Sequence, residues 1–111
     1  MIGIDVIIDE TGNLSSCSAS GHAGAGETGT DIICAAVSVL MRTLVRVLSN
    51  RKGISIRSAA PEPGRLWLEI EYTAEGSDYL SAAGDFLITG LGSVADEFPK
   101  NCKLTVTERR N

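Results

Sequence analysis

The most constraining feature of the sequence is a long segment with a helical pattern. Residues 31–52 contain neither proline nor glycine, and their apolar side chains recur every three or four positions, as on one face of an α-helix. The first half of this segment, Ile32 to Met41, is apolar on nearly every side. We therefore expect other elements of the fold to cover this helix on more than one side.

Shorter segments alternate apolar and polar residues, which is typical of strands. Two of them flank the turn residues Asp9 to Asn13 and form a predicted hairpin. Another pair flanks the turn from Pro61 to Gly64. The expected strands cover residues 2–8, 14–20, a segment beginning at Ile54, residues 66–72 and a segment beginning at Cys102.

A second helix is expected over residues 77–98, because Pro99 ends its apolar pattern. It contains Gly84, Gly90 and Gly92, each of which weakens a helix by roughly 1 kcal/mol relative to alanine. These glycines indicate either close packing or a break in the helix. The expected order is β-β-α-β-β-α-β in a single domain of residues 1–111, an α+β fold in which two main helices lie on a largely antiparallel sheet.

Composition and charge narrow the class of protein. The net charge is −4, which disfavours direct nucleic-acid binding and suits a cationic partner. No segment approaches the roughly 20 consecutive apolar residues of a membrane-spanning helix, and the N-terminus has no basic region of the kind found in signal peptides. The three cysteines have no disulfide-like spacing. We expect a soluble, cytoplasmic domain with no membrane partner.

The segment GHAGAGETGTDIICAAVS, residues 21–38, holds the only histidine, His22, and one of the cysteines, Cys34. If Thr30 or Asp31 caps the helix, Cys34 lies in its first turn, where the positive end of the helix dipole favours a thiolate. Backbone N–H groups without helical partners, around Cys34 and Ala35, would then stabilise an oxyanion. The glycine-rich loop between the two side chains is long enough to bring imidazole toward sulfur. Its candidate substrate-binding residues are Gly21, Gly24, Gly26 and Gly29.

Several readings of this segment remain open on the residues alone. Asp31 caps the helix or orients His22, and Ser38, one turn beyond Cys34, either hydrogen-bonds near the site or only packs. Cys34 itself is also compatible with a buried core position. The loop lacks the Gly-Lys-Ser/Thr ending of a phosphate-binding loop, and the cysteines and His22 have no metal-ligand spacing. We therefore expect neither a metal nor a cofactor.

The same segment, GHA followed by a glycine-containing loop and GTDIICAAVS, resembles the signature of the ribosomal-processing cysteine proteases, the Prp family of bacteria. The resemblance implies that Cys34 is the nucleophile and His22 its acid–base partner. It implies a substrate, the short N-terminal extension of large-subunit ribosomal protein twenty-seven, and it implies a homodimer. A basic ribosomal protein agrees with the acidic charge of the chain.

Two other classes of function compete with a protease. In a non-enzymatic, ribosome-associated binding or assembly domain, Cys34 would be a core residue and the glycine-rich loop would hold the partner. In a redox-sensing protein, the Cys34 thiol would react with peroxide, but the chain would cleave no peptide.

Overall fold

The computed structural model describes residues 1–21 and 30–109. The elements follow the expected order β-β-α-β-β-α-β, with one short 3-10 turn, η1, inserted before the second helix. Their bounds agree closely with the alternating and helical patterns of the sequence. The elements are β1 (Ile2–Ile8), β2 (Leu14–Ser20), α1 (Thr30–Leu48), β3 (Ile54–Glu62), β4 (Arg65–Tyr72), η1 (Ala74–Gly76), α2 (Ser77–Glu97) and β5 (Cys102–Glu108).

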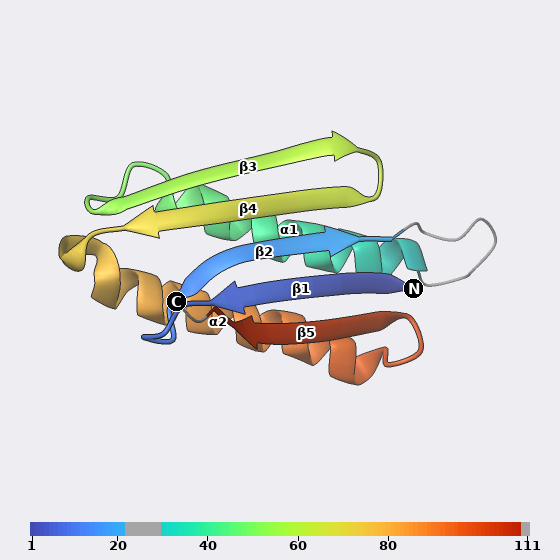
Figure 1. The fold of residues 1–111 in the computed structure, drawn as a ribbon. Helices are drawn as coiled ribbons and strands as arrows, with labels where there is room; N and C mark the ends of the chain where they lie inside the picture. The colour runs from blue at the N-terminus through green and yellow to red at the C-terminus, as the bar shows by residue number, and fades with distance from the viewer. Residues whose placement is uncertain (22–29, 110–111) are drawn as a thin grey trace.

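The strands form one sheet in the order β3-β4-β2-β1-β5 (Figure 1). Three of the neighbouring pairs are antiparallel, β1 with β2, β2 with β4, and β3 with β4. The fourth pair, β1 with β5, is parallel, with Ile2 opposite Cys102 at the start of both strands. The expected α+β class with a largely antiparallel sheet is therefore confirmed.

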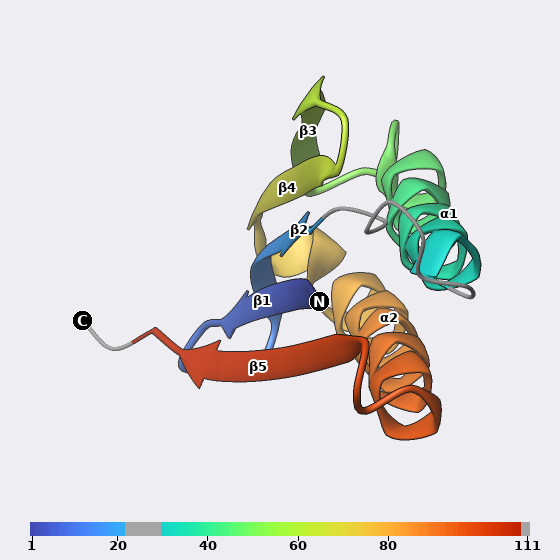
Figure 2. The same cartoon turned by 90° about the vertical axis from the view of Figure 1, so that its right-hand side faces the viewer.

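Both helices lie on the same face of the sheet, so the molecule has two layers (Figure 2). The core lies between the layers, where the inward residues of the strands meet one stripe of each helix. On α1 this stripe includes Ile33, Val37 and Met41, which are almost fully buried. The strands and α2 also contribute large, fully buried side chains to the core, among them Ile4, Leu14, Leu68, Leu80, Leu87 and Leu91.

The coverage of α1 is less complete than its composition predicts. The sheet and α2 cover two sides of it, as expected. However, Ile32 and Val39 remain 70% and 62% exposed on a third side. The strongly apolar first half of α1 is therefore only partly explained by packing among the described residues.

Helix α2 is continuous from Ser77 to Glu97, and two of its glycines, Gly84 and Gly90, serve close packing. A Cβ atom on Gly84 would lie 3.2 Å from the Cβ of Leu14 in β2. A Cβ atom on Gly90 would lie 3.2 Å from a methyl group of Leu40 in α1. These glycines let α2 approach the sheet and α1. In the described part of the chain, no helix combines the length and apolar character needed to cross a membrane.

Candidate active site

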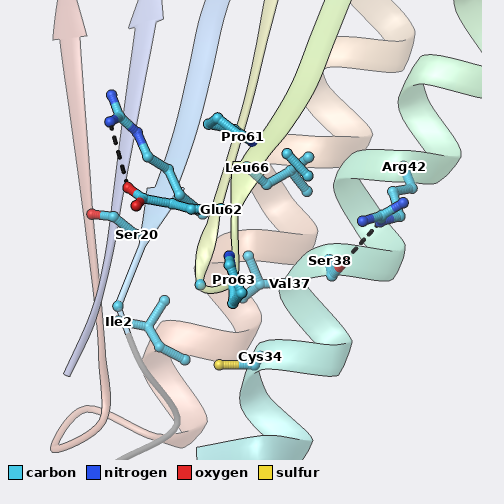
Figure 3. A pocket seen from close by; sticks show the side chains of 15 residues that line it. Ile2, Ser20, Cys34, Val37, Ser38, Arg42, Pro61, Glu62, Pro63 and Leu66 are labelled. Carbon is cyan, nitrogen blue, oxygen red and sulfur yellow. Dashed lines mark hydrogen bonds and ion pairs between the residues drawn. The ribbon is translucent and has the colours of Figure 1, made fainter.

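A groove of about 480 Å³ opens where three elements meet: the end of β2, the N-terminal half of α1 and the tip of the β3–β4 hairpin. We call it the Cys34 groove. Figure 3 shows Cys34, Ser38 and Arg42 following one another along α1, with Pro61, Pro63 and Leu66 on the facing hairpin. The groove thus has a polar edge, formed by one helix, and a largely apolar wall.

Cys34 is the thiol of this site. It is partly exposed, packs against the edge of the core and lines the groove, and its sulfur points from α1 toward the side of the groove that holds Ile2 (Figure 3). The other two cysteines are buried. Burial raises the pKa of Cys17 to about 12, with a further contribution from Asp5. Burial also raises the pKa of Cys102, and the negative charge of a Cys34 thiolate would raise it further.

The start of α1 differs from the expectation in one respect. Thr30 and Asp31 are themselves helical, so neither residue is the N-cap. Cys34 is consequently the fifth helical residue, and its N–H donates to a carbonyl one turn earlier in a regular α-helix. By these bounds the N–H groups without helical partners are those of the first turn, whereas the sequence analysis expected them around Cys34 and Ala35. Ala35 is exposed and is not part of the groove lining.

Most of the remaining predicted site residues lie outside the part of the chain that the structure describes. His22, Gly24, Gly26 and Gly29 lie outside the described residues, as does the side chain of Asp31. Gly21 is described and lines the groove at the end of β2.

Gly21 has a backbone conformation that strongly favours glycine. Its φ is +143°, and a side chain there would collide with the backbone of Met1. Its N–H donates to the carbonyl of Gly64 at 3.0 Å, which ties the end of β2 to the hairpin tip. The chain therefore leaves β2 toward residue 22 directly from the wall of the groove.

Ser38 lines the groove one turn beyond Cys34, which favours the reading in which it lies near the site. Its Oγ accepts a hydrogen bond of 3.0 Å from the Nε of Arg42, a further turn along α1. The sequence analysis did not identify Arg42 as a site residue. Residues four apart share a helix face, and Arg42 lies two such steps beyond Cys34. This spacing could have indicated from the sequence that both side chains lie on the same side of α1.

The hairpin tip is the other part of the site that the sequence analysis missed. Pro61 and Pro63 supply apolar surface at the tip, and Leu66 adds to it from β4. Glu62 and Arg65 form an exposed ion pair of 4.0 Å on the rim of the groove. The sequence predicts the turn from Pro61 to Gly64, but no local pattern indicates that this turn lies across the groove from Cys34.

Taken together, this geometry offers a partly exposed thiol at one end of a groove that is large enough for a few residues of an extended peptide. Within residues 1–21 and 30–109, no cluster of three or more histidine, cysteine, aspartate or glutamate side chains is arranged to hold a metal ion. A partly exposed thiol in a groove of this kind can act as a nucleophile toward a bound peptide.

The family model described as cysteine protease Prp matches residues 1–103 of the chain. No curated protein sequence matches this chain. Among solved structures, SMU.848 from Streptococcus mutans is similar with a TM-score of 0.78 at 28% identity, covering 98% of this chain and 96% of that one.

Two further solved structures are of the essential ribosomal processing protease Prp from S. aureus. The complex with a substrate peptide is similar at 22% identity, with a TM-score of 0.77, over 96% of this chain and all of the other. The complex with a covalently linked product peptide gives a TM-score of 0.77 at 20% identity, over the same shares of the two chains. At these identities the likeness shows a shared fold.

Proposed function

The chain belongs to the family of the cysteine protease Prp, and we propose that it is an endopeptidase that uses Cys34 as nucleophile and His22 as acid and base. The observation that carries the proposal is the placement of Cys34. Among the three cysteines, it is the one that is not buried, and it lies in a groove beside the chain segment that leads to residue 22.

The proposed reaction begins with attack of the Cys34 thiolate on the scissile carbonyl carbon, which forms the C–S bond and a tetrahedral oxyanion. Protonated His22 donates its proton to the leaving amine as the C–N bond breaks, leaving an acyl-enzyme. His22 then takes a proton from water, the hydroxide attacks the acyl carbon, and the C–S bond breaks. The acid product leaves, and the thiolate is restored.

The start of α1 supports this mechanism in a modified form. Side chains in a helix lean toward its N-terminus, which favours an approach of the Cys34 side chain to the first turn of α1. The partnerless N–H groups of that turn, which begins at Thr30, are then the donors for the oxyanion. We retain Asp31, in that turn, and Ser38 as supporting residues, and the segment containing Gly21, Gly24, Gly26 and Gly29 as the substrate-binding loop.

We propose that the substrate is the N-terminal extension of large-subunit ribosomal protein twenty-seven. The S. aureus relatives, which share the fold, are ribosomal processing proteases seen with a substrate peptide and with a product peptide. The apolar wall of the Cys34 groove suits an extended peptide, and the net charge of −4 attracts a basic ribosomal protein. The proposed catalytic unit spans residues 1–111, works in the cytoplasm and contacts neither nucleic acid nor membrane directly.

We further propose that the chain acts as a homodimer. Apolar side chains on the outer faces of the two helices support this proposal, among them Ile32, Val39 and Phe86, which are largely exposed in the single chain. Burial of such side chains against a second copy is favourable in proportion to the apolar area removed from water.

The test is to incubate the purified chain with the extended ribosomal protein from the same source and to analyse the products by mass spectrometry. We expect a shortened product, none with Cys34→Ala, and a strong reduction with His22→Ala. Cys102→Ala, which removes a buried thiol outside the groove, is the matched control and should leave cleavage intact. Cleavage by Cys34→Ala would show that the nucleophile is wrongly assigned.

Alkylation of the same proteins separates the protease from its rivals. A groove thiol should react with iodoacetamide near neutral pH, whereas Cys17 and Cys102 are buried with raised pKa values and should not. A binding or assembly domain predicts no reactive cysteine and no cleavage. A redox sensor predicts a reactive Cys34 and peroxide consumption but no shortened product.

A further inference from the structure

Arg42 occupies a distinctive position in the Cys34 groove. Cys34, Ser38 and Arg42 are spaced four residues apart on one stripe of α1, and all three line the groove (Figure 3). Because a helix rises 1.5 Å per residue, Arg42 lies about 12 Å along the helix axis from Cys34. An extended peptide covers about 3.3 Å per residue, so Arg42 is level with a substrate position about three or four residues from the scissile bond.

Part of the Arg42 guanidinium is already used within the chain. Its Nε donates to the Oγ of Ser38, which holds the side chain along the groove. The terminal nitrogens of the guanidinium form a planar pair of donors whose geometry matches a carboxylate. Within the described residues, no carboxylate lies within ion-pair distance of them.

Among the described residues that line the groove, Arg42 is the cation that forms no ion pair. Arg65 also lines the groove, but it is paired with Glu62 on the rim. The wall facing α1 is apolar at Pro61 and Leu66, and it reduces the access of water to a group bound between it and the helix. A carboxylate bound in this part of the groove would meet an Arg42 side chain that has no competing ion pair among the described residues.

We propose that Arg42 is a specificity-determining residue: it selects substrates that carry a carboxylate side chain three or four residues from the scissile bond. This inference rests on the proposed protease function and assigns part of its substrate recognition. Arg42 could instead bind only a backbone carbonyl of the peptide, and that mode would give no preference among substrate side chains. An experiment that compares substrate side chains therefore separates the two modes.

The experiment uses peptides that span the cleavage site mapped by mass spectrometry or, where nothing is cleaved, overlapping peptides from the N-terminal extension of the ribosomal protein. Pairs of peptides differ only in glutamate or glutamine at one position, taken in turn on both sides of the scissile bond. We expect the glutamate peptide to be cleaved with a kcat/KM about two- to fivefold higher at one of the positions three or four residues away, as for an ion pair with an exposed arginine. Added salt should reduce this ratio.

Variants assign the preference to a residue. Arg42→Met should bring the glutamate-to-glutamine ratio of kcat/KM to about one, whatever its effect on the absolute rate of cleavage, because Arg42 also bonds Ser38 in the groove. Arg46→Met, one turn further along α1 at an exposed position that is not part of the groove lining, is the matched control and should keep the ratio. No preference in the unaltered chain, or one that survives Arg42→Met, would overturn the proposal.

Failure of the protease function would look different. Binding of the same peptides to Cys34→Ala, followed by fluorescence anisotropy, reports the preference without cleavage. A glutamate preference in binding that Arg42→Met removes supports the role of Arg42 even where the unaltered chain cleaves nothing. Equal binding of the glutamate and glutamine peptides, together with equal cleavage, refutes the role of Arg42 and leaves the protease assignment standing.

Discussion

At the scale of single residues, Asp9 connects three elements of the fold. Its carboxylate accepts hydrogen bonds from the backbone N–H groups of Thr11 and Asn13, from the Thr11 hydroxyl and from the hydroxyl of Tyr72 at the end of β4. The buried side chain of Asn13 in turn donates to Ser77 at the start of α2. These bonds tie the turn between β1 and β2 to β4 and to α2. The turn lies at the end of the sheet opposite the Cys34 groove (Figure 1).

We predict that Asp9→Asn makes the free energy of unfolding less dependent on pH. Burial alone would raise the pKa of Asp9, but hydrogen bonds from Tyr72, Thr11 and Asn13 together outweigh it and lower the pKa from 3.8 to about 2. A folded pKa below the unfolded value stabilises the fold above about pH 4, and this contribution is lost as the pH falls toward 2. The substitution should cost about 1–2 kcal/mol near neutral pH and progressively less in acid.

Urea unfolding followed by the fluorescence of Trp67, the only tryptophan, measures this difference at several pH values. Glu10→Gln, at the exposed neighbouring position, controls for the removal of one negative charge. A deficit in Asp9→Asn that stays constant down to about pH 2.5 would show that its hydrogen bonds do not depend on the charged form.

Individual site residues were predictable from the sequence to different degrees. Cys34 could be proposed because a thiol near a helix start, preceded by a glycine-rich loop and a lone histidine, is chemically specific. Arg42 lay within the same helical pattern, but an arginine on a helix usually faces solvent, so its position beside the groove appears only in three dimensions. The carboxylate of Asp9 was recognised as part of a turn, but not its bond to Tyr72, far along the chain.

At the scale of elements, the glycines of α2 make a testable contrast. Gly84→Ala removes the entropic disadvantage of glycine but places a Cβ atom 3.2 Å from the Cβ of Leu14, which is fixed in β2 and cannot swing away. Gly92→Ala gains the same helix propensity and meets only a Leu104 methyl group at 3.9 Å. We predict that Gly84→Ala is destabilising by about 1 kcal/mol and that Gly92→Ala is stabilising by up to about 1 kcal/mol.

Urea unfolding at constant pH measures both substitutions, each of which serves as the control for the other. If Gly84→Ala stabilises the chain as much as Gly92→Ala does, Leu14 can move and α2 does not need glycine at this contact.

The secondary structure was largely predictable, because each element has its own local period. Alternation in β1, β2 and β4 and the spacing in α1 and α2 depend only on neighbouring residues. The bounds of β1, β2, β4 and α2 agree with the structure to within about two residues, whereas α1 ends at Leu48, about four residues before the end of the helical pattern. The order of strands in the sheet was not predictable in this way. It places β4 between β3 and β2 and brings the Pro61–Gly64 turn to Cys34 through contacts between distant parts of the chain.

At the scale of the whole molecule, the two-layer architecture leaves two broad surfaces with different chemistry. On the open face of the sheet, polar and charged residues such as Ser18, Arg57 and Glu69 lie on adjacent strands, and Arg57 and Glu69 form an ion pair of 2.6 Å. On the other side of the molecule, the outer faces of α1 and α2 form an apolar groove of about 370 Å³ that includes Val47 and Phe86. Association through burial of apolar area therefore favours the helical side.

This contrast gives a prediction about the proposed homodimer. If two copies associate through their helical faces, Phe86, which is 74% exposed in the single chain, lies in the interface. Phe86→Asp would then bury a charge in apolar surroundings and weaken association by at least about tenfold. Arg57→Asp introduces the same side chain on the open face of the sheet and should leave association unchanged.

Sedimentation velocity over a range of concentrations measures both variants against the unaltered chain, which should sediment at twice the mass of 11.7 kDa. Dissociation by Phe86→Asp alone assigns the interface to the helices and explains why α1 is more apolar than packing within one chain requires. Dissociation by Arg57→Asp alone would move the interface to the sheet. A monomer at every concentration of the unaltered chain would refute the homodimer, and the exposed Ile32 and Val39 would then require a different partner.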